Sequence, residues 1–223
     1  MRTPVAVAIA ALAALLAACE PSAGEPAAPP APTPAAPAPA DGPRASAGWR
    51  EIASSDDASR LGRLDQAWRM GRAEADREFA AQVEALGPLV DPNAGQAGRL
   101  QPPPGSYRCR SIKLGSGEPG GPGYLEHPVS RCTVELTPGG DLVLTSQTGS
   151  QRARGLLYPD TDRRLVFIGA RTRGPEDAAP PAYGQGPEGD RIGVFERIGS
   201  DRWRLVLPWP KQDSKLEILE LVR

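Results

Sequence analysis

The chain has 223 residues, with 26 Lys and Arg against 27 Asp and Glu, and a formal net charge of −1. It shows neither a basic stripe nor aromatic residues interleaved with Lys and Arg, so we expect no nucleic-acid partner. His127 is the single histidine. This excludes any metal site that needs two imidazoles, and we expect no metal and no cofactor.

The first 18 residues predict an export signal. Arg2 gives the chain a positive start, and Val5–Ala18 is an apolar run dominated by alanine and leucine. As a helix at about 1.5 Å per residue, this run would span roughly 20 Å, which is short of the ~30 Å hydrocarbon core of a bilayer. A removable lipoprotein signal peptide over 1–18 is therefore expected rather than a membrane-spanning helix.

Cys19 follows the apolar run directly, and Leu16-Ala17-Ala18-Cys19 resembles the bacterial lipobox. We predict that Cys19 carries lipid, so that the protein is exported and anchored to the bacterial cell envelope, facing the periplasm. Several acyl chains at ~0.8 kcal/mol per buried CH₂ would hold it firmly on the membrane. The alternative is an ordinary secretory signal whose cysteine is incidental.

The segment behind Cys19 predicts a tether. Glu20–Gly48 is a low-complexity Pro/Ala segment with almost no large apolar side chain. It cannot offset its ordering entropy, so we expect 19–48 to be disordered. Proline biases it toward extended polyproline II at ~3.1 Å per residue, which gives a reach of up to roughly 90 Å. The tether would hold a domain away from the membrane surface.

The segment 49–92 is predicted to be helical. Ser54 and Ser55 are suitable N-caps, and apolar residues recur at steps of three and four, forming one stripe. The stripe consists of Leu61, Leu64, Trp68, Ala75, Phe79, Val83 and Leu86. Gly71 costs ~1 kcal/mol relative to alanine, so the helix is expected to be kinked or split there. We expect the stripe to pack on the following sheet, the alternative being contact with a partner.

Residues 93–223 change from a helical period to short alternating segments separated by turn signals. Eight strands are predicted over 106–114, 131–137, 142–148, 152–158, 164–170, 192–198, 202–208 and 216–222. Regular short strands of this kind favour an antiparallel meander that closes into a barrel or a curled sheet. With the helix packed on it, the prediction is a single α+β domain.

The connections between these strands differ in length. In an up-and-down meander, odd-numbered connections lie at one end and even-numbered ones at the other, so the long connections 115–130 and 171–191 share one rim. That rim is the default binding site. The predicted ligand-binding residues on or beside it are Tyr124, His127, Gln151, Arg152, Tyr183, Trp209 and Lys211. The alternative is that the long connections are merely solvated Pro/Gly insertions.

Cys109 and Cys132 lie on the first and second predicted strands. In an oxidising compartment we predict a disulfide between them, worth roughly 3 kcal/mol in the chain-entropy model. Placing the two cysteines directly opposite each other would put Arg110 opposite Arg131 and Pro128 at an edge or bulge. The alternative is a pair of free buried thiols.

We find no catalytic motif in the sequence, because it contains no G-x-S-x-G elbow that would present a serine to His127. We therefore predict a non-enzymatic module that binds a ligand or an envelope protein and is held off the membrane by the Pro/Ala spacer. Two alternatives stay open. One is an inhibitor of an envelope hydrolase that acts through a long barrel loop. The other is an envelope enzyme of unknown chemistry that uses His127 with a carboxylate such as Glu126.

A resemblance to a bacterial family, domain of unknown function 4893, is carried by five segments. These are "PPPGSYRCRSIKLG", "TGSQRARGLLYPDTDRRLVFIG", "ERIGSDRWRLVLPWP", "EILELV" and "LGRLDQAWRM". The resemblance covers nearly all of 49–223 and implies a single exported or lipid-anchored domain. It brings no known activity, so no functional residue follows from it.

Overall fold

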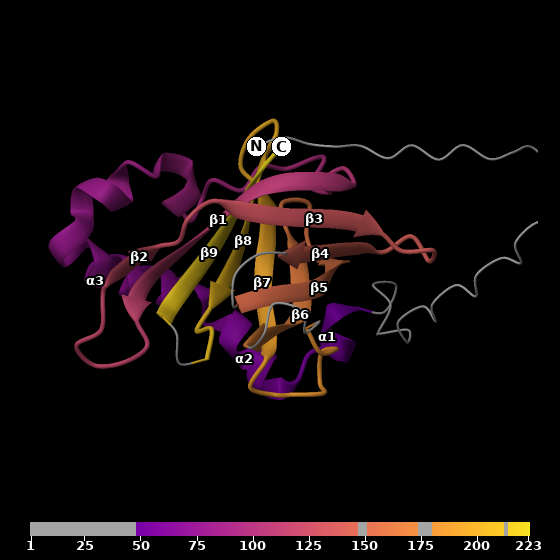
Figure 1. The fold of residues 1–223 in the computed structure, drawn as a ribbon, viewed down its shortest axis with the longest axis horizontal. Helices are drawn as coiled ribbons and strands as arrows, with labels where there is room; N and C mark the ends of the chain where they lie inside the picture. Colours follow the sequence, from indigo (N-terminus) through magenta and orange to yellow (C-terminus); the bar gives the residue numbers. More distant parts are fainter. Residues whose placement is uncertain (1–47, 147–150, 174–179, 212–213) are drawn as a thin grey trace, which may run out of the picture. The chain divides into compact units, whose positions relative to one another are not determined.

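The computed structural model describes residues 48–146, 151–173, 180–211 and 214–223 (Figure 1). The predicted signal peptide, the lipid on Cys19 and the tether up to residue 47 lie outside the described residues. The helical elements are α1 (Trp49–Ile52), α2 (Ser55–Gly62), α3 (Leu64–Glu84) and the 3₁₀ helix η1 (Gly87–Val90). The strands are β1 (Gly105–Ser116), β2 (Tyr124–Glu126), β3 (Ser130–Leu136), β4 (Leu142–Ser146), β5 (Gln151–Pro159), β6 (Leu165–Arg173), β7 (Asp190–Arg197), β8 (Arg202–Pro208) and β9 (Ser214–Val222).

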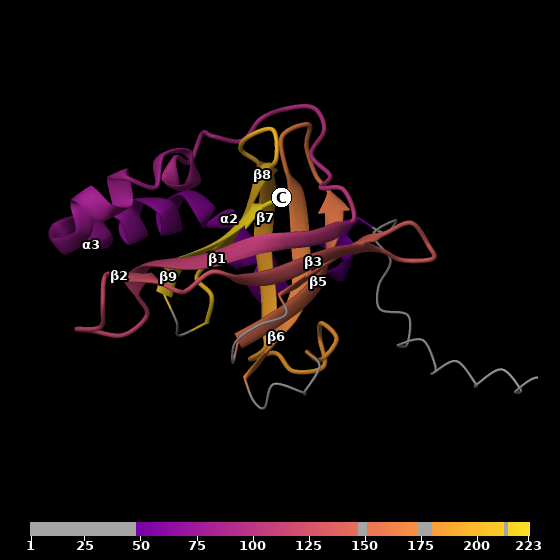
Figure 2. The same cartoon turned by 45° about the horizontal axis from the view of Figure 1, so that its top comes forward.

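The strands form a closed antiparallel barrel. From β3 to β9 each strand pairs with the next along the chain, β1 pairs with β3, and β9 pairs back with β1. The short strand β2 is an addition that also pairs with β1. In Figure 2, β1 and β3 run across the strands behind them, as expected of strongly tilted barrel strands. The structure confirms the predicted α+β fold with an eight-stranded meander.

Side-chain alternation along the strands produces two hydrophobic cores, because successive residues face opposite sides of the barrel wall. Phe167, Phe195 and Trp203 belong to the cluster inside the barrel, whereas Val166 and Val194 belong to the cluster shared with the helices. Helices α2 and α3 pack against β1, β7, β8 and β9. Much of the barrel wall is therefore buried on both faces.

The helical stripe is divided, but not at the expected residue. Ser54 caps α2, its hydroxyl accepting a hydrogen bond from the Asp57 N–H at 3.2 Å. The break between α2 and α3 falls at Arg63 (φ −102°, ψ 21°), and α3 is kinked at Phe79 (φ −126°, ψ 24°). The predicted interruption at Gly71 is wrong, because Gly71 is a buried residue within α3.

Gly71 lets α3 approach the sheet closely. A Cβ atom at this position would lie 3.0 Å from the Leu114 carbonyl oxygen and 3.3 Å from the Leu216 Cβ. We expect Gly71→Ala to lower the free energy of unfolding by about 1 kcal/mol, because overpacking of about 1–3 kcal/mol outweighs a gain of ~1 kcal/mol in helix propensity. Urea unfolding followed by circular dichroism measures the change. Gly62→Ala is the matched control, since nothing lies within 4 Å of its added Cβ. Equal stabilisation of both variants would contradict the close-approach argument.

Cys109 and Cys132 form the predicted disulfide, but the predicted register is wrong. Cys109 faces Ser130 and Cys132 faces Tyr107, so the two cysteines are diagonal neighbours with Cα atoms 5.9 Å apart. This separation lies within the ~4.4–6.8 Å usual for disulfides, so a diagonal pair is bridged without direct opposition. Arg131 consequently faces Arg108 rather than Arg110.

The segment 127–129 forms a bulge between β2 and β3. Ile112 pairs with Glu126 and Cys109 pairs with Ser130, so two residues of β1 face three residues of the opposing chain. The proline of this segment has no N–H to donate and occupies the interruption of the ladder, in agreement with its expected place at a bulge. The extra residue shifts the register between β2 and β3 by one residue.

Candidate functional site

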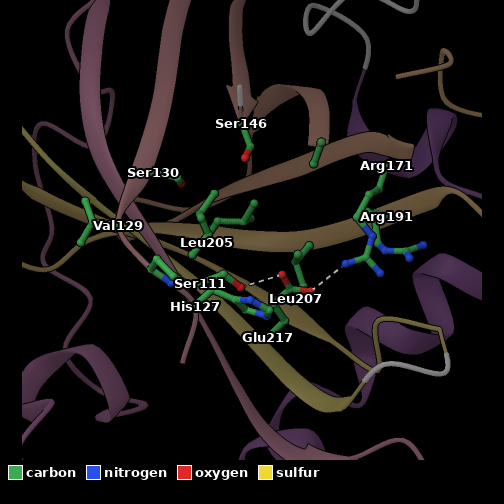
Figure 3. A pocket seen from close by; sticks show the side chains of 13 residues that line it. Ser111, His127, Val129, Ser130, Ser146, Arg171, Arg191, Leu205, Leu207 and Glu217 are labelled. Atoms are coloured by element: carbon green, nitrogen blue, oxygen red, sulfur yellow. Dashed lines mark hydrogen bonds and ion pairs between the residues drawn. The ribbon is translucent and has the colours of Figure 1, made fainter. Parts of the chain in front are cut away.

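A cavity of about 370 Å³ lies in the end of the barrel that carries the long connections (Figure 3). All eight barrel strands contribute to its wall, and so does the bulge. The lining residues are Ser111, His127, Pro128, Val129, Ser130, Ser146, Ala153, Arg171, Arg191, Leu205, Leu207, Glu217 and Leu219. Its volume lies at the lower end of the ~300–1,000 Å³ of small-molecule sites. The strand ends that flank both long connections meet here, as the meander parity predicts.

Glu217 on β9 organises the polar side of the cavity. Its Oε1 accepts a hydrogen bond from the Ser111 hydroxyl at 2.9 Å, and its Oε2 accepts one from Arg171 Nη1 at 3.3 Å. Glu217 and Arg171 are both buried, and a buried charge is tolerated when it is paired and hydrogen-bonded. The ion pair therefore fixes the Arg171 guanidinium against the cavity wall.

Arg191 on β7 is held next to Arg171, and Figure 3 shows the two side chains together at one end of the cavity. Arg191 is 2% exposed, and its Nη1 donates to the carbonyl oxygens of Glu188 at 2.9 Å and Asp190 at 2.8 Å. The described lining residues include two guanidinium groups, those of Arg171 and Arg191, and one carboxylate, that of Glu217. Arg171 is paired with Glu217, and both guanidinium groups have partners within the protein.

His127 in the bulge adds a polar atom to the cavity. Its Nε2 is buried and has no hydrogen-bond partner among the described residues. Ser111 donates to Glu217 rather than to the imidazole, so these two residues do not form the serine–histidine pair of nucleophilic catalysis. The bulge also borders a hollow of about 650 Å³ that is lined by Arg108 and Arg110.

The opposite side of the cavity is apolar. Leu205 and Leu207 on β8 and Leu219 on β9 line it, and all three belong to the hydrophobic cluster inside the barrel. The cavity is thus continuous with the core on one side and charged on the other. An amphipathic lining of this kind accepts an apolar group and orients a polar one.

Two of the predicted rim aromatics fasten the helices to the barrel. The Tyr183 hydroxyl donates to Asp57 Oδ2 at 2.5 Å and accepts from the Ser54 N–H at 2.9 Å. Burial and the bond to Asp57 raise the pKa of Tyr183. Trp209, which adopts a positive φ of 48°, donates from its indole to the Arg63 carbonyl at 3.4 Å. Both side chains therefore anchor the region of α2, and neither lines the cavity.

Tyr124 has a similar packing role on α3. Its ring stacks on Phe79 with centroids 5.5 Å apart, and its hydroxyl donates to Glu126 Oε2 at 2.7 Å. Burial and the Glu126 carboxylate raise the pKa of Tyr124 to about 12. Tyr124 therefore holds β2 against the kink of α3.

The remaining predicted rim residues are dispersed. Arg152 is buried and Lys211 is half-buried, and neither lines the cavity. Burial and the positive charge of Arg60 lower the pKa of Lys211. The side chain of Gln151 lies outside the described residues. Of the seven rim residues predicted, the structure places His127 in the cavity.

The sequence analysis missed the charged lining of the cavity, although strand alternation contained the signal. Arg171 shares the inward face of β6 with Phe167, which lies two alternations before it. Glu217 likewise shares the inward face of β9 with Leu219 and Leu221. A charged residue on the core-facing side of a strand marks a cavity or a buried ion pair.

The fold and the site define a class of protein, a helix-covered antiparallel barrel with an amphipathic cavity at one end that buried arginine and glutamate side chains line. The chain belongs to the family described as Domain of unknown function (DUF4893), which matches residues 49–221. No curated protein and no solved structure matches the chain.

Two further findings concern the part of the chain that the structure describes. No helix in it has the length and apolar character needed to traverse a bilayer. Within the same residues, no group of three or more His, Cys, Asp and Glu side chains is placed to hold a metal ion.

Proposed function

We propose that this protein is a lipid-anchored, non-enzymatic protein of the bacterial cell envelope that binds a small molecule in the barrel cavity. The observation that carries the proposal is the cavity itself, to which every barrel strand contributes and in which Arg171, Arg191 and Glu217 are buried. Buried charges are costly, and side chains that packed hydrophobically would fill the barrel at lower cost. A binding role accounts for keeping them.

A small molecule is favoured over a protein partner by the same geometry. Exposed aromatic anchors dominate protein recognition, but Tyr124, Tyr183 and Trp209 are packed on the protein's own helices. The cavity volume of about 370 Å³ suits a small molecule and not a folded segment. An inhibitory loop inserted into a hydrolase is therefore the less supported role.

The membrane anchor in this proposal rests on the sequence. Lipid on Cys19 would attach the protein to the envelope membrane, and the Pro/Ala tether over 19–48 would let the barrel reach ligands away from the surface. The binding site and its anchor are then separate parts of one chain.

The test is native mass spectrometry of the full protein extracted from its own membrane. We expect acyl mass on the chain and a bound small molecule that dissociates on activation. Ala153→Phe places a ring in the cavity from β5 and is expected to reduce occupancy at least ~10-fold, since loss of about 1.4 kcal/mol of binding free energy suffices. The control is Ala81→Phe on the exposed face of α3. Absence of any small molecule, or equal occupancy in both variants, would contradict binding in the cavity.

A further inference from the structure

We infer that the bulge 127–129 is a gate in the barrel wall, through which the small molecule of the proposed function enters and leaves the cavity. The inference rests on the proposed function, because it describes how that same site exchanges its ligand. It follows from where the bulge lies, how it is held, and which of its atoms lacks a partner.

The bulge separates two hollows. All three of its residues line both the cavity of about 370 Å³ and the neighbouring hollow of about 650 Å³. The cavity lies inside the barrel, because its leucine residues belong to the inner hydrophobic cluster. The neighbouring hollow lies on the outside of the wall, since Arg108 and Arg110 line it and alternate with the inward-facing Cys109. Displacement of the bulge would therefore connect the cavity with the outer surface.

On the side of β1, the backbone of the bulge interrupts the ladder of hydrogen bonds. β1 pairs with β2 on one side of the bulge and with β3 on the other. Within the bulge, the His127 N–H donates to the Ser111 carbonyl oxygen at 2.8 Å, whereas Pro128 has no N–H to donate. The bulge is thus attached to β1 less firmly than the strands that flank it.

On the side away from β1, the bulge has no neighbouring strand within the described part of the chain. β4 ends at Ser146, which faces Cys132, and no described strand pairs with 127–129 on this side. The Val129 side chain is 56% exposed, so packing adds little to the attachment. A segment with few buried contacts and an interrupted ladder opens at a lower free energy than a strand paired on both sides.

His127 lowers the free-energy difference between the closed and open positions. Its Nε2 is buried and has no hydrogen-bond partner among the described residues. Burying a polar atom without a partner has a desolvation cost that contact with water recovers. Displacement of the bulge toward the outer hollow would bring the imidazole into contact with water, and the open position would recover this cost.

The other end of the cavity is held more firmly. Arg171 pairs with Glu217 at 3.3 Å, and Arg191 donates to backbone carbonyl oxygens of its own segment. Figure 3 shows this end away from His127 and Val129. Opening the wall there would separate a buried ion pair, which is strongly destabilising. The bulge is therefore the favoured place for a ligand to pass.

The test is stopped-flow fluorescence with N-phenyl-1-naphthylamine, an uncharged dye that fluoresces in apolar sites. The full chain carries Cys19→Ser, which removes the predicted lipidation and the need for detergent. His127→Phe keeps an aromatic ring but removes the unpartnered nitrogen, so it stabilises the closed position. We expect the entry and exit rate constants of the dye to fall together by about 10-fold, which corresponds to about 1.4 kcal/mol. Kd stays nearly unchanged, because a gate alters both rates equally.

A second variant is expected to act in the opposite direction. Pro128→Gly removes the ring that restricts the backbone of the bulge, and both rate constants should rise about 2–5-fold. Leu136→Ala is the matched control, since Leu136 is an apolar residue of β3 that is 58% exposed and lies outside both hollows. It should alter neither rate. Ala153→Phe fills the cavity and should abolish dye binding.

Amide hydrogen exchange at residue 127 measures opening without a ligand, because this N–H is bonded to Ser111 in the closed position. After correction for intrinsic rates, we expect slower exchange in His127→Phe and faster exchange in Pro128→Gly than in the parent chain. Equal exchange in all three would overturn the inference, whether or not the dye binds.

The dye kinetics can contradict the inference independently. An altered exit rate with a matching change in Kd would make His127 a ligand contact rather than part of a gate. Dye that fails to bind the parent chain, or that still binds Ala153→Phe, would count against binding in the cavity. Hydrogen exchange would then still decide whether the bulge opens.

Discussion

Replacing Arg204 by methionine is expected to lower the free energy of unfolding by about 3–5 kcal/mol, the range for breaking a buried ion pair from one side. Arg204 is 0% exposed, and its Nη2 lies 2.7 Å from a Glu196 carboxylate oxygen. Its Nη1 donates to the carbonyl oxygens of Pro88 at 3.1 Å, Leu89 at 3.0 Å and Asp91 at 2.7 Å. Methionine fills much of the same volume but offers none of these donors.

The expected loss arises because one side chain joins two parts of the fold. The carbonyl groups belong to η1 and the residues after it, whereas the guanidinium comes from the barrel wall on β8. Acceptors that lose their donor while they stay buried cost their full desolvation energy. The barrel and the segment that follows the helices are therefore expected to loosen together.

Arg202→Met is the matched control for Arg204→Met, because it lies two residues earlier on the same strand. Its side chain is 31% exposed and lies 2.6 Å from Glu220, a buried carboxylate that keeps Arg110 as a second partner, so we expect a change below ~1 kcal/mol. Guanidinium denaturation followed by far-UV circular dichroism measures both variants. If Arg204→Met were no more destabilising than Arg202→Met, the buried network would have no net role in stability.

The strands were predictable because local sequence determines them. Alternating apolar residues bounded by Gly, Asp and Pro turns predicted a strand over 164–170, and β6 spans Leu165–Arg173. The same reasoning placed the other barrel strands within a few residues of their observed bounds. The strand order followed from the short hairpins, since antiparallel neighbours need only a few connecting residues.

Register and helix breaks were not predictable, because they depend on contacts between distant segments. The disulfide was assumed to join opposed residues, whereas the β1–β3 pairing sets Cys109 opposite Ser130 and Cys132 opposite Tyr107, which leaves the two cysteines diagonal. Gly71 was expected to interrupt a helix on the basis of propensity. Its environment decides otherwise, because Leu114 and Leu216 approach α3 where a side chain would not fit.

The end of the barrel that holds the cavity was predictable, whereas most of the residues that line the cavity were not. Parity of the connections indicated the end of the barrel at which the cavity lies, and His127, one of the residues predicted for that rim, lines the cavity. Aromatic residues were chosen because they are typical of binding sites. Sequence alone does not reveal that Tyr183 and Trp209 pack on the helices, because that depends on how α2 crosses the rim.

Removing the disulfide is the second large effect that we expect. The double variant Cys109→Ala/Cys132→Ala should lower the free energy of unfolding by about 3 kcal/mol, because the bond closes a loop with a sequence separation of 23 residues. For a domain of this size that loss corresponds to a decrease in Tm of about 6–12 °C. Both cysteines are buried, at 1% and 0% exposure, so the missing sulfur atoms also leave space in the inner core.

Calorimetry of the oxidised protein, the double variant and the protein in dithiothreitol measures the effect, with Cys19→Ser as the control that should leave Tm unchanged. Because Cys109 pairs with Ser130, and Ser130 lines the cavity, the disulfide also holds one wall of the cavity. Reduction is therefore expected to weaken binding of the proposed small molecule together with stability. A Tm that stays unaltered in protein whose thiol content shows complete reduction would show that the β1–β3 pairing holds this wall without the covalent bond.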